Sequence, residues 1–308
     1  MNYYMKRLTI FTPTYNRAYI LPKLYKSLCV QTCQDFEWLI VDDGSTDSTH
    51  ELVDGWILEA KIAIRYFYQA NSGKMRATNY AMKMASSELF VCVDSDDELA
   101  NGDVVKDSLD FWSNREKIAK GLNSNCKLCG MVSRKKNPFV KSSENLGFPF
   151  IGTCIDIDIT YKEESTIFVK TDIIRMFPYP EFEGEKFITD IYIYEAISEF
   201  YSFLYHPYYF QIIEYQEDGY TKSFRKLLFT NPKGHREFQR LRIRLKRTHY
   251  WRNVVNDISM SLFIRDHTLF SNSPNLKMTL LLYPMGCLKY LYDKYLLSKE
   301  IRNERRRT

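Results

Sequence analysis

Apolar runs and amphipathic stretches alternate along the first third of the chain. Four short apolar runs have the length of buried strands, and the segments between them carry apolar residues at helical spacing. Strands that alternate with helices in this way predict an α/β fold with a mainly parallel sheet flanked by helices. The expected strands are residues 8–11, 36–41, 62–67 and 89–93, and the expected helices are residues 20–30, 46–59, 73–85 and 103–117.

Each of the four expected strands ends in a polar cluster. Ligands of parallel α/β sheets bind outside the carboxyl ends of the strands, so the four polar loops are expected to converge on one rim of the sheet. The sequence therefore predicts one site assembled from segments far apart in the chain. The clusters are Thr12–Arg17, Asp42–Asp47, Gln69–Arg76 and Asp94–Glu98.

The pattern is less regular beyond residue 102, and from about Gly219 onward the chain looks helical and basic. We expect one α/β domain over residues 1–219 and a largely helical, basic region over residues 220–308. Between them lie mixed signals, namely strand-like runs at 127–133, 166–169 and 203–213 and short helical stretches at 172–177 and 191–199.

Charge divides the chain in the same way. Residues 1–220 hold 23 Lys and Arg against 32 Asp and Glu, whereas residues 221–308 hold 20 against 6, and the whole chain has a net charge of +5. A basic segment of this kind attracts phosphates, either on a nucleic acid or on an anionic membrane. Hydrophobic residues make up 45% of the chain, which excludes a disordered protein.

Cysteine usage indicates a reducing compartment. The seven cysteines are an odd number, and no secretory signal pattern precedes the first expected strand. Cys126 and Cys129 have the spacing of a zinc knuckle, but no second pair follows, and a structural zinc site needs about four ligands. We therefore expect ordinary thiols in a cytoplasmic protein.

The acids that follow the fourth expected strand are the strongest chemical signal. Asp94, Asp96, Asp97 and Glu98 crowd the end of an apolar run, and a divalent cation relieves the repulsion between such carboxylates. Mg²⁺ and Mn²⁺ take oxygen ligands and share them with substrate phosphates. The alternative is a solvated start of the next helix, which the abrupt end of the apolar run disfavours.

The other polar clusters are weaker signals when each is taken alone. Asp43 at the end of the second strand fits a nucleobase or ribose donor, and Tyr15 fits a stacked base; both also fit simple turns. Lys74 and Arg76 lie at a helix N-terminus, which favours anions. The spacing of a P-loop is absent, which argues against an ATPase.

Taken together, the clusters resemble the inverting glycosyltransferases of family 2, which have the GT-A fold. The resemblance covers about Leu8 to Gly102 closely, and the order and spacing of several motifs make it specific. The motifs are Pro13–Arg17, Gln31–Thr32 with Phe36–Glu37, Val41–Asp47, Asn71–Lys74 with Arg76 and Asn79, and Asp94–Asp97.

The resemblance implies a nucleotide-sugar donor, most often a UDP-sugar, and an enzyme of the hexosyl- or N-acetylhexosaminyl-transferase type. By position, Pro13, Tyr15, Asp43 and Arg76 look like the nucleoside-binding residues, and Asn71 is assigned to the same donor site. Residues about 1–102 would then form the donor half of the catalytic domain, and residues about 103–219 the acceptor half.

The resemblance also implies a metal site and a general base. Asp94 and Ser95 are expected against the ribose and diphosphate, and Asp96 looks like the acid of a D-x-D motif that coordinates Mn²⁺ or Mg²⁺, with Asp94 assisting. For the base the match is looser, because the familiar Glu-Asp dipeptide is missing. Asp190 is the first choice, with Glu185 and Glu183 as alternatives and a plain helix cap as the structural explanation.

The basic C-terminal region leaves three interpretations open. It is an in-plane amphipathic anchor on an anionic membrane, a helical appendage that packs on the catalytic domain, or a nucleic-acid binder, which the absence of a recognition motif disfavours. The apolar stretch 276–297 contains charges and is expected to break at Pro284 and Gly286, so it is not a transmembrane helix.

The sequence thus predicts a cytoplasmic, peripherally membrane-associated glycosyltransferase of surface polysaccharide biosynthesis, whose acceptor is a glycan or a lipid-linked glycan. No nucleic-acid partner is expected. The alternative is a non-catalytic nucleotide-sugar or polyanion-binding protein on the same fold. A nucleotidyltransferase would need a glycine-rich first loop, which Thr12–Tyr15 is not.

Overall fold

The computed structural model describes residues 6–122, 124–138, 149–153, 156, 164–214, 216 and 220–304. The chain divides into two compact units: unit 1 comprises residues 1–178 and 193–216, and unit 2 comprises residues 179–192 and 217–308. Gly219 lies outside the described residues, and a functional division at that point stays a prediction. Unit 2 also includes residues 179–192, which the sequence prediction assigns to the α/β domain.

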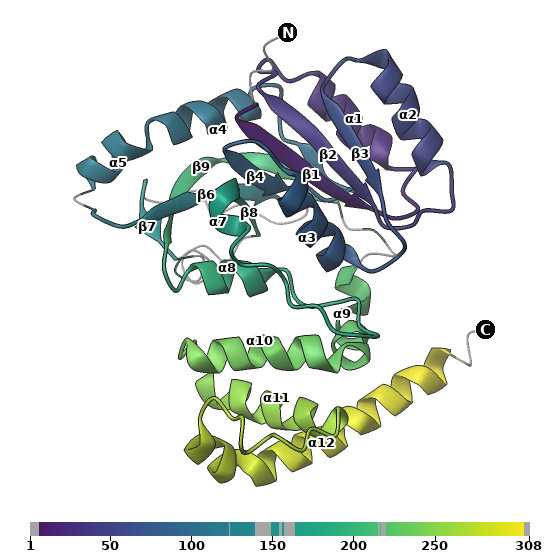
Figure 1. Ribbon diagram of the computed structural model, residues 1–308, viewed down its shortest axis with the longest axis vertical. Helices are drawn as coiled ribbons and strands as arrows, with labels where there is room; N and C mark the ends of the chain where they lie inside the picture. The colour runs from purple at the N-terminus through teal and green to yellow at the C-terminus, as the bar shows by residue number, and fades with distance from the viewer. Residues whose placement is uncertain are drawn as a thin grey trace. The chain divides into compact units, whose positions relative to one another are not determined.

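Unit 1 is built on a mixed sheet that has nine strands within the described residues (Figure 1). The order is β3–β2–β1–β4–β8–β6–β9–β5, with β7 paired to β9. The first four of these strands are parallel, as predicted, whereas β8 is antiparallel to both β4 and β6. The strands are β1 (Leu8–Thr14), β2 (Phe36–Asp42), β3 (Ile64–Tyr68), β4 (Leu89–Cys92), β5 (Glu98–Leu99), β6 (Leu128–Lys136), β7 (Ile151–Gly152), β8 (Ser165–Lys170) and β9 (Ser202–Ile212).

Helices cover both faces of the parallel part of the sheet. Successive strand residues point to opposite faces, so Leu8 and Ile10 join a core with Leu24 and Trp56, while Phe11 stacks on Phe90 on the other face. Helix α3 packs against β1 and β2. The helices of this unit are α1 (Leu21–Cys29), α2 (Thr49–Glu59), α3 (Lys74–Met84), α4 (Val104–Ser113), α5 (Arg115–Gly121), α7 (Thr171–Ile174) and most of α8 (Ile191–Ile197).

Two boundaries differ from the sequence prediction for local reasons. Strand β1 continues through Pro13 to Thr14; since β4 ends at Cys92, opposite Phe11, this last stretch has a strand on one side only, a position where proline is tolerated. The single helix predicted over residues 103–117 is two helices, α4 and α5, that meet at Asn114, a residue type that favours helix caps.

Unit 2 consists mainly of four helices in the described part of the chain (Figure 1). Helix α10 packs on α11, and α11 packs on α12. The break expected at Pro284 is wrong, because α12 runs through it without interruption. A Cβ at Gly286 would lie 2.3 Å from Ile258, so this glycine allows α11 and α12 to pack closely. The helices are α9 (Tyr220–Thr230), α10 (Pro232–Arg244), α11 (Tyr250–Phe263) and α12 (Leu276–Glu304).

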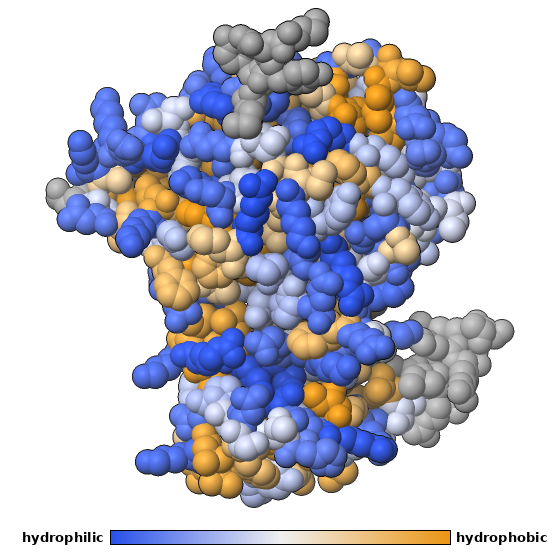
Figure 2. All heavy atoms as spheres, viewed as in Figure 1, coloured by the Kyte–Doolittle hydropathy of each residue, from blue (hydrophilic) through white to orange (hydrophobic). Residues whose placement is uncertain are grey.

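Helix α12 exposes a row of large apolar side chains. Figure 2 shows hydrophobic surface next to hydrophilic surface over the lower helices, where Figure 1 draws α12. Within the described residues, no helix combines the length and the apolar character needed to cross a membrane. The most exposed members of this row are Leu281, Leu288, Leu291, Tyr292 and Tyr295.

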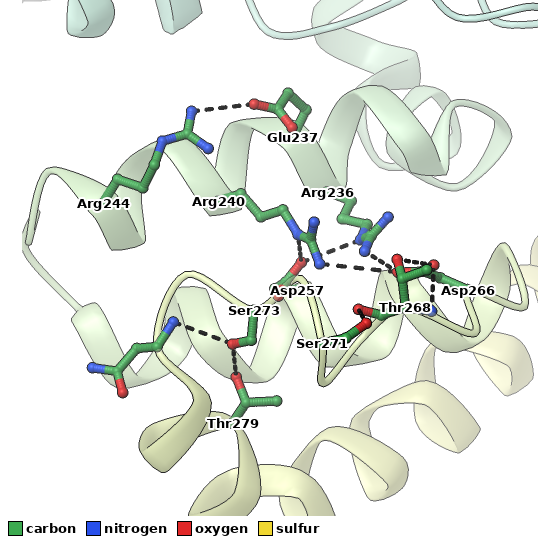
Figure 3. A network of polar contacts seen from close by, with 11 residues as sticks. Arg236, Glu237, Arg240, Arg244, Asp257, Asp266, Thr268, Ser271, Ser273 and Thr279 are labelled. Carbon is green, nitrogen blue, oxygen red and sulfur yellow. Dashed lines mark hydrogen bonds and ion pairs between the residues drawn. The ribbon is translucent and has the colours of Figure 1, made fainter.

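Buried ion pairs neutralise part of the basic charge of unit 2. Figure 3 shows Arg236 and Arg240 of α10 pointing toward Asp257 of α11 and Asp266. Arg240 Nε lies 3.0 Å from the fully buried Asp257 carboxylate, and Arg236 contacts both acids. Two arginines and two acids therefore form a balanced network that joins α10 to α11.

Candidate functional site

The register of the parallel strands sets the polar loops side by side. Thr14 at the end of β1 pairs with Asp42 at the end of β2, and Asp42 in turn pairs with Tyr68 at the end of β3. On the other side, Phe11 of β1 pairs with Cys92 at the end of β4. The loops that follow these four strands consequently begin at one edge of the sheet.

Asn16 ties the first loop to the second. It adopts a left-handed backbone conformation, with φ of +54°, which asparagine tolerates better than most residues. Its backbone N–H donates to Ser45 Oγ at 2.8 Å, and its side-chain oxygen accepts from the backbone N–H of Thr46 at 2.7 Å. Beside it, Tyr15 is left 47% exposed, and Pro13 is partly buried. An exposed ring on a fixed loop is suited to stacking against a planar ligand.

Asp43 ties the second loop to the third. Its buried carboxylate accepts hydrogen bonds from Gln69 Nε2 at 2.7 Å and from the backbone N–H groups of Ser72 and Gly73, each at 2.8 Å. Such charge-assisted bonds are among the stronger polar contacts in proteins. The residue predicted to bind a nucleoside therefore also holds the loop that precedes α3.

Gly44 brings the same two loops into direct backbone contact. A Cβ at this position would lie 2.8 Å from the backbone nitrogen of Asn71, and the φ of +89° is a conformation that only glycine adopts readily. Asn71 is exposed at this contact. The close approach of the second loop to the third therefore explains why residue 44 is a glycine.

Lys74 ties the third loop to the fourth. Its ammonium lies 2.8 Å from Asp94 Oδ1, and the lysine side chain is only 16% exposed. Although burial opposes the charged form, the charges of Lys74 and Lys135 hold the pKa of Asp94 below its usual value. Arg76, two residues further along α3, donates to the Ser72 carbonyl at 3.4 Å. Lys74 and Arg76 are therefore fixed near the start of α3, and Lys74 holds Asp94 of the fourth loop beside them.

Asp96 differs from Asp94 in having no cation beside it. Among the described residues, no Lys, Arg or His lies within 4.0 Å of its carboxylate, and burial together with the charge of Asp94 raises its pKa. A divalent cation would relieve this repulsion, so Asp96 and Asp94 fit Mg²⁺ or Mn²⁺ in charge and ligand type. Ser95 between them is buried.

No set of three metal-ligating His, Cys, Asp or Glu side chains occurs anywhere in the described parts of the chain. Two carboxylates alone leave most of an octahedral coordination shell to other oxygens. Mg²⁺ bound through one or two carboxylates characteristically takes the rest from water and substrate phosphates. The rim thus fits a metal that arrives together with a phosphorylated ligand.

Asp97 is held by the far half of the sheet. Its buried carboxylate accepts from Gln211 Nε2 and from the backbone N–H of Glu214, and Lys135 Nζ lies 3.9 Å away. Burial raises the pKa of Asp97 to about 7. Residues of β6 and β9 therefore anchor the acidic turn through Asp97, while Asp94 is bound by Lys74.

Asp190 belongs to unit 2 and lies just before α8. It is exposed, and its backbone carbonyl accepts a 2.7 Å hydrogen bond from Tyr179 Oη. Glu185 is instead engaged with the start of α10, because its two carboxylate oxygens accept from the backbone N–H groups of Lys233 and Gly234 at 2.9 and 2.8 Å. Glu183 is exposed. The structure thus shows a capping role for Glu185 and leaves the other two acids accessible.

Several residues of the rim were not found from the sequence. Lys135, Gln211 and Glu214 contact Asp97 from strands that are distant in the chain, and nothing in their local sequence marks them. Tyr66, which donates to Asp42 at 2.6 Å, lies inside an expected strand where a tyrosine is unremarkable. Gln69 was already part of the third polar cluster, and only its partner Asp43 was unknown.

The family model described as "Glycosyl transferase family 2" matches residues 9–147 of this chain. The Campylobacter jejuni protein named GalNAc(5)-diNAcBac-PP-undecaprenol beta-1,3-glucosyltransferase is 34% identical over 100 residues, which is 32% of each chain. Two uncharacterized glycosyltransferases, from Rickettsia felis and Rickettsia conorii, are each 37% identical over 91 residues, which is 30% of this chain and only 15% of their own length. The family expected from the motifs is confirmed for residues 9–147, which are somewhat less than half of the chain.

Solved structures show the same fold. The Staphylococcus aureus protein TarS, residues 1–349 in complex with UDP-GlcNAc, aligns with a TM-score of 0.59 and 21% identity over 91% of this chain and 78% of that chain. The mannosyltransferase PcManGT from Pyrobaculum calidifontis, in complex with GDP-Man and Mn²⁺, aligns with a TM-score of 0.54 and 16% identity over 98% of this chain and 88% of that chain. The expected GT-A fold is confirmed.

Proposed function

Because residues 9–147 of this chain are a glycosyl transferase family 2 domain, we propose that the protein is an inverting glycosyltransferase. It transfers a sugar from a nucleotide-sugar to a hydroxyl group of a glycan or lipid-linked glycan during surface polysaccharide synthesis. The observation that carries this proposal is the pair of acids on the rim, where Asp94 is bound to Lys74 and Asp96 has no cation within 4.0 Å in the part of the chain that the structure describes.

The donor site uses the interlocked loops. Tyr15 and Asp43 bind the nucleoside, with Pro13, Asn71 and Arg76 around it, since these residues lie on the three loops that Asn16, Asp43 and Gly44 hold together. A UDP-sugar is the favoured donor because TarS was solved with UDP-GlcNAc, although PcManGT was solved with GDP-Man.

The diphosphate end of the donor meets the acidic turn. Asp96 and Asp94 would hold Mn²⁺ or Mg²⁺, and Ser95 would lie against the diphosphate. When bound, the metal neutralises the charge that develops on the leaving nucleoside diphosphate. Lys74 and Arg76 contribute positive charge at the N-terminus of α3, which stabilises the same leaving group.

Asp190 is the proposed general base. It removes the proton from the acceptor hydroxyl, whose oxygen attacks C1 of the sugar as the bond to the diphosphate breaks, and the anomeric centre inverts. Two observations support this choice over Glu185: Asp190 is exposed, and both carboxylate oxygens of Glu185 already accept backbone hydrogen bonds. Glu183 remains the alternative base.

The acceptor and the location follow from relatives and from α12. The Campylobacter relative is named for a substrate linked through PP to undecaprenol, which supports a lipid-linked acceptor here. The exposed apolar row on α12 lies on a helix that also carries Lys277, Lys289 and Lys294. Such a helix is suited to lie in the plane of an anionic membrane surface, so we place the enzyme at the cytoplasmic face of the cell membrane.

Donor binding is the first test. The full chain is screened for thermal stabilisation by UDP-, GDP- and dTDP-sugars, each with and without Mn²⁺, and a UDP-sugar is expected to stabilise only with the metal. Asp96→Asn should abolish the Mn²⁺-dependent part, whereas Asp110→Asn, which removes an exposed acid of α4, should not. An Asp96→Asn variant with the wild-type response would overturn the metal assignment.

Turnover is the second test. Addition of a glycan acceptor should release UDP from the bound donor. Stabilisation by donor with no UDP release across glycan and lipid-linked acceptors would indicate the non-catalytic binding protein instead.

Membrane association has its own test, flotation of the full chain with phosphatidylglycerol vesicles. Leu281→Gln with Leu288→Gln should reduce the bound fraction, and phosphatidylcholine vesicles should bind less than the anionic ones. Equal flotation by both vesicle types, or no effect of the double variant, would contradict the anchor.

A further inference from the structure

Unit 2 encloses a cavity of its own. Its volume is about 560 Å³, within the range of about 300–1,000 Å³ that is usual for sites of small molecules. Side chains of α9, α10, α11 and α12 all line it. Neither the donor site nor the proposed base uses these residues, so the cavity is unexplained by the proposed function.

The charge of this cavity is strongly positive. Arg225, Arg242, Arg252 and Lys289 line it, and Asp293 is the one acid among the lining residues. That acid is already neutralised, because Lys289 Nζ lies 2.5 Å from one of its oxygens and 2.6 Å from the other, and Ser259 Oγ donates to it at 2.9 Å. Asp293 therefore offers no further negative charge to Arg225 and Arg252 in the cavity.

These arginines differ from the balanced pair in Figure 3. Arg236 and Arg240 are held by Asp257 and Asp266, whereas Arg225 and Arg252 form no ion pair within 4.0 Å in the described chain and are exposed. The guanidinium of Arg242 lies 5.4 Å from the centre of the Phe238 ring. Guanidinium groups can bind phosphate oxygens through two parallel hydrogen bonds, so arginines that line a cavity suit a phosphorylated ligand.

His235 adds a second, independent observation. Its Nδ1 is buried and has no hydrogen-bond partner among the described residues, although the ring lines the cavity. Buried polar atoms are rarely left without a partner, so the polar part of the cavity wall at His235 is incompletely satisfied among the described residues.

The rest of the lining is apolar. A site that combines arginines with hydrocarbon and aromatic walls is suited to an anion that carries an apolar chain. The apolar lining residues are Phe224, Leu228, Phe229, Phe238, Met260 and Leu296. The exposed row of α12 also reaches the cavity, because Tyr292 belongs to both.

We propose that this cavity binds a phosphorylated amphiphile, namely a phosphate or diphosphate joined to a hydrocarbon chain. The arginines bind the phosphate oxygens and the apolar wall binds the first part of the chain. This inference rests on the proposed function in one respect, since such an amphiphile is the lipid carrier of the acceptor glycan, and it assigns that carrier to unit 2.

The test measures binding of three soluble probes to the full chain by calorimetry: farnesyl diphosphate, inorganic diphosphate and farnesol. Each titration is repeated with excess UDP, which would displace a probe from a nucleotide site but not from this cavity. Farnesyl diphosphate is expected to bind at least about tenfold more tightly than either other probe, because each of them lacks half of the recognised chemistry.

Charge variants locate the site. Arg225→Gln with Arg252→Gln should weaken farnesyl diphosphate binding about tenfold or more, as expected for the loss of two charge-assisted contacts. The matched control, Arg244→Gln with Lys246→Gln, removes two exposed cations at the end of α10 that do not line the cavity and should change affinity less than about twofold. Leu228→Gln should weaken farnesyl diphosphate but not inorganic diphosphate.

The outcomes separate the alternatives. Equal affinity for inorganic diphosphate and farnesyl diphosphate would indicate a soluble phosphate ligand and overturn the amphiphile. Displacement by UDP, or equal losses in the pocket and control variants, would overturn the site. Because the probes contain no sugar nucleotide, a failure here leaves the Mn²⁺-dependent stabilisation by UDP-sugars unaffected, and the reverse also holds.

Discussion

The two units of this chain handle charge in opposite ways. On the rim of unit 1, acids outnumber cations, and the carboxylates are bound by backbone N–H groups, by neutral side chains and by Lys74. In unit 2, cations outnumber acids, and the acids Asp257 and Asp266 lie against arginines. An excess of carboxylate attracts a metal and an excess of arginine attracts phosphate, so each unit is suited to one part of a reaction between phosphorylated compounds.

The units also differ in how they are held together. The rim of unit 1 is joined by contacts between neighbouring loops, in which Asn16, Asp43 and Gly44 each bridge two motifs. Unit 2 is joined by an ion network between helices, shown in Figure 3. The following predictions test whether these differences hold.

Asp190→Asn carries the largest expected effect. The amide cannot accept the acceptor proton, so sugar transfer should fall about 10²–10⁴-fold while donor affinity stays unchanged. Steady-state rates are compared with the Mn²⁺-dependent thermal stabilisation by the donor. This would show that unit 2, to which Asp190 belongs, takes part in the chemistry.

Glu183→Gln is the matched control for Asp190, because Glu183 is also exposed and lies in the same segment. It should transfer sugar at the wild-type rate. If Glu183→Gln abolishes sugar transfer and Asp190→Asn does not, the base is Glu183. If both are active, unit 2 has no catalytic role and the comparison loses its functional meaning.

Asp257→Asn should cause the largest loss of stability in unit 2. Without this carboxylate, Arg236 and the buried Arg240 are left with Asp266 as their counterion in this network. Breaking a buried ion pair lowers the free energy of unfolding by about 3–5 kcal/mol. Hydrogen–deuterium exchange followed by mass spectrometry reports each unit separately, and protection of α10 and α11 should fall.

The control for this network is Glu237→Gln, which breaks the more exposed pair of Arg244 and Glu237, whose atoms lie 3.2 Å apart. Exposed pairs are worth about 0–1 kcal/mol, so exchange should barely change. Equal protection in Asp257→Asn and wild type would mean that packing alone holds the four helices together.

The sequence predicted the rim of unit 1 well because each motif ends a strand. Asp43 and Asp94 follow apolar runs that any β-strand pattern reveals, and the parallel sheet then sets their neighbours. The mutual contacts were not predictable, since Asp43 meets the backbone of Gly73 through the register of three strands. The strand-like runs expected at 127–133, 166–169 and 203–213 correspond to β6, β8 and β9, but the antiparallel pairing of β8 was not predicted, because these strands pair across long connections.

The sequence predicted unit 2 poorly because helix packing carries no local signature. Its basic character was evident, but the acids that balance Arg236 and Arg240 lie 17 or more residues away along the chain. Helix α12 also continues through Pro284, although proline disfavours a helix interior, and the close approach of Gly286 to Ile258 of α11 could not be seen in the sequence. The cavity of four helices could not be found at all.

His206 gives unit 1 a stability that depends on pH. Burial lowers the pKa of this histidine to about 4, and Ser133 lies 2.9 Å from its Nδ1. In the unfolded chain a histidine has a pKa of about 6.5. Between about pH 4 and pH 6.5 the unfolded chain therefore binds a proton that the folded chain does not bind. The contribution of His206 to the free energy of unfolding is fully present above about pH 6.5 and is lost as the pH falls toward 4.

Lowering the pH from about 7 to about 5 should destabilise unit 1 by about 2 kcal/mol through His206, while Asp97, whose pKa burial raises to about 7, contributes in the opposite direction. His206→Gln keeps a polar partner for Ser133 but does not titrate, and Asp97 is present in both proteins, so over this pH interval β6 and β9 should keep more exchange protection in the variant than in the wild type. A pH response as large in the variant as in wild type would place the titrating group elsewhere.

Gly44→Ala tests the contact between the second and third loops of the rim. The left-handed φ of +89° costs a non-glycine residue about 1–2 kcal/mol, and the added Cβ would lie 2.8 Å from the Asn71 nitrogen. The loops must separate, so stabilisation by the UDP-sugar should decrease together with the protection of the residues around Asn71.

Gly55→Ala is the control within the same unit. Gly55 lies inside α2, and nothing lies within 4 Å of a Cβ built on it, so alanine there should stabilise the fold by about 0.5–1 kcal/mol. If Gly44→Ala binds the donor as the wild type does, the loops act independently, and the contrast between an interlocked rim and a helical unit joined by ion pairs is wrong.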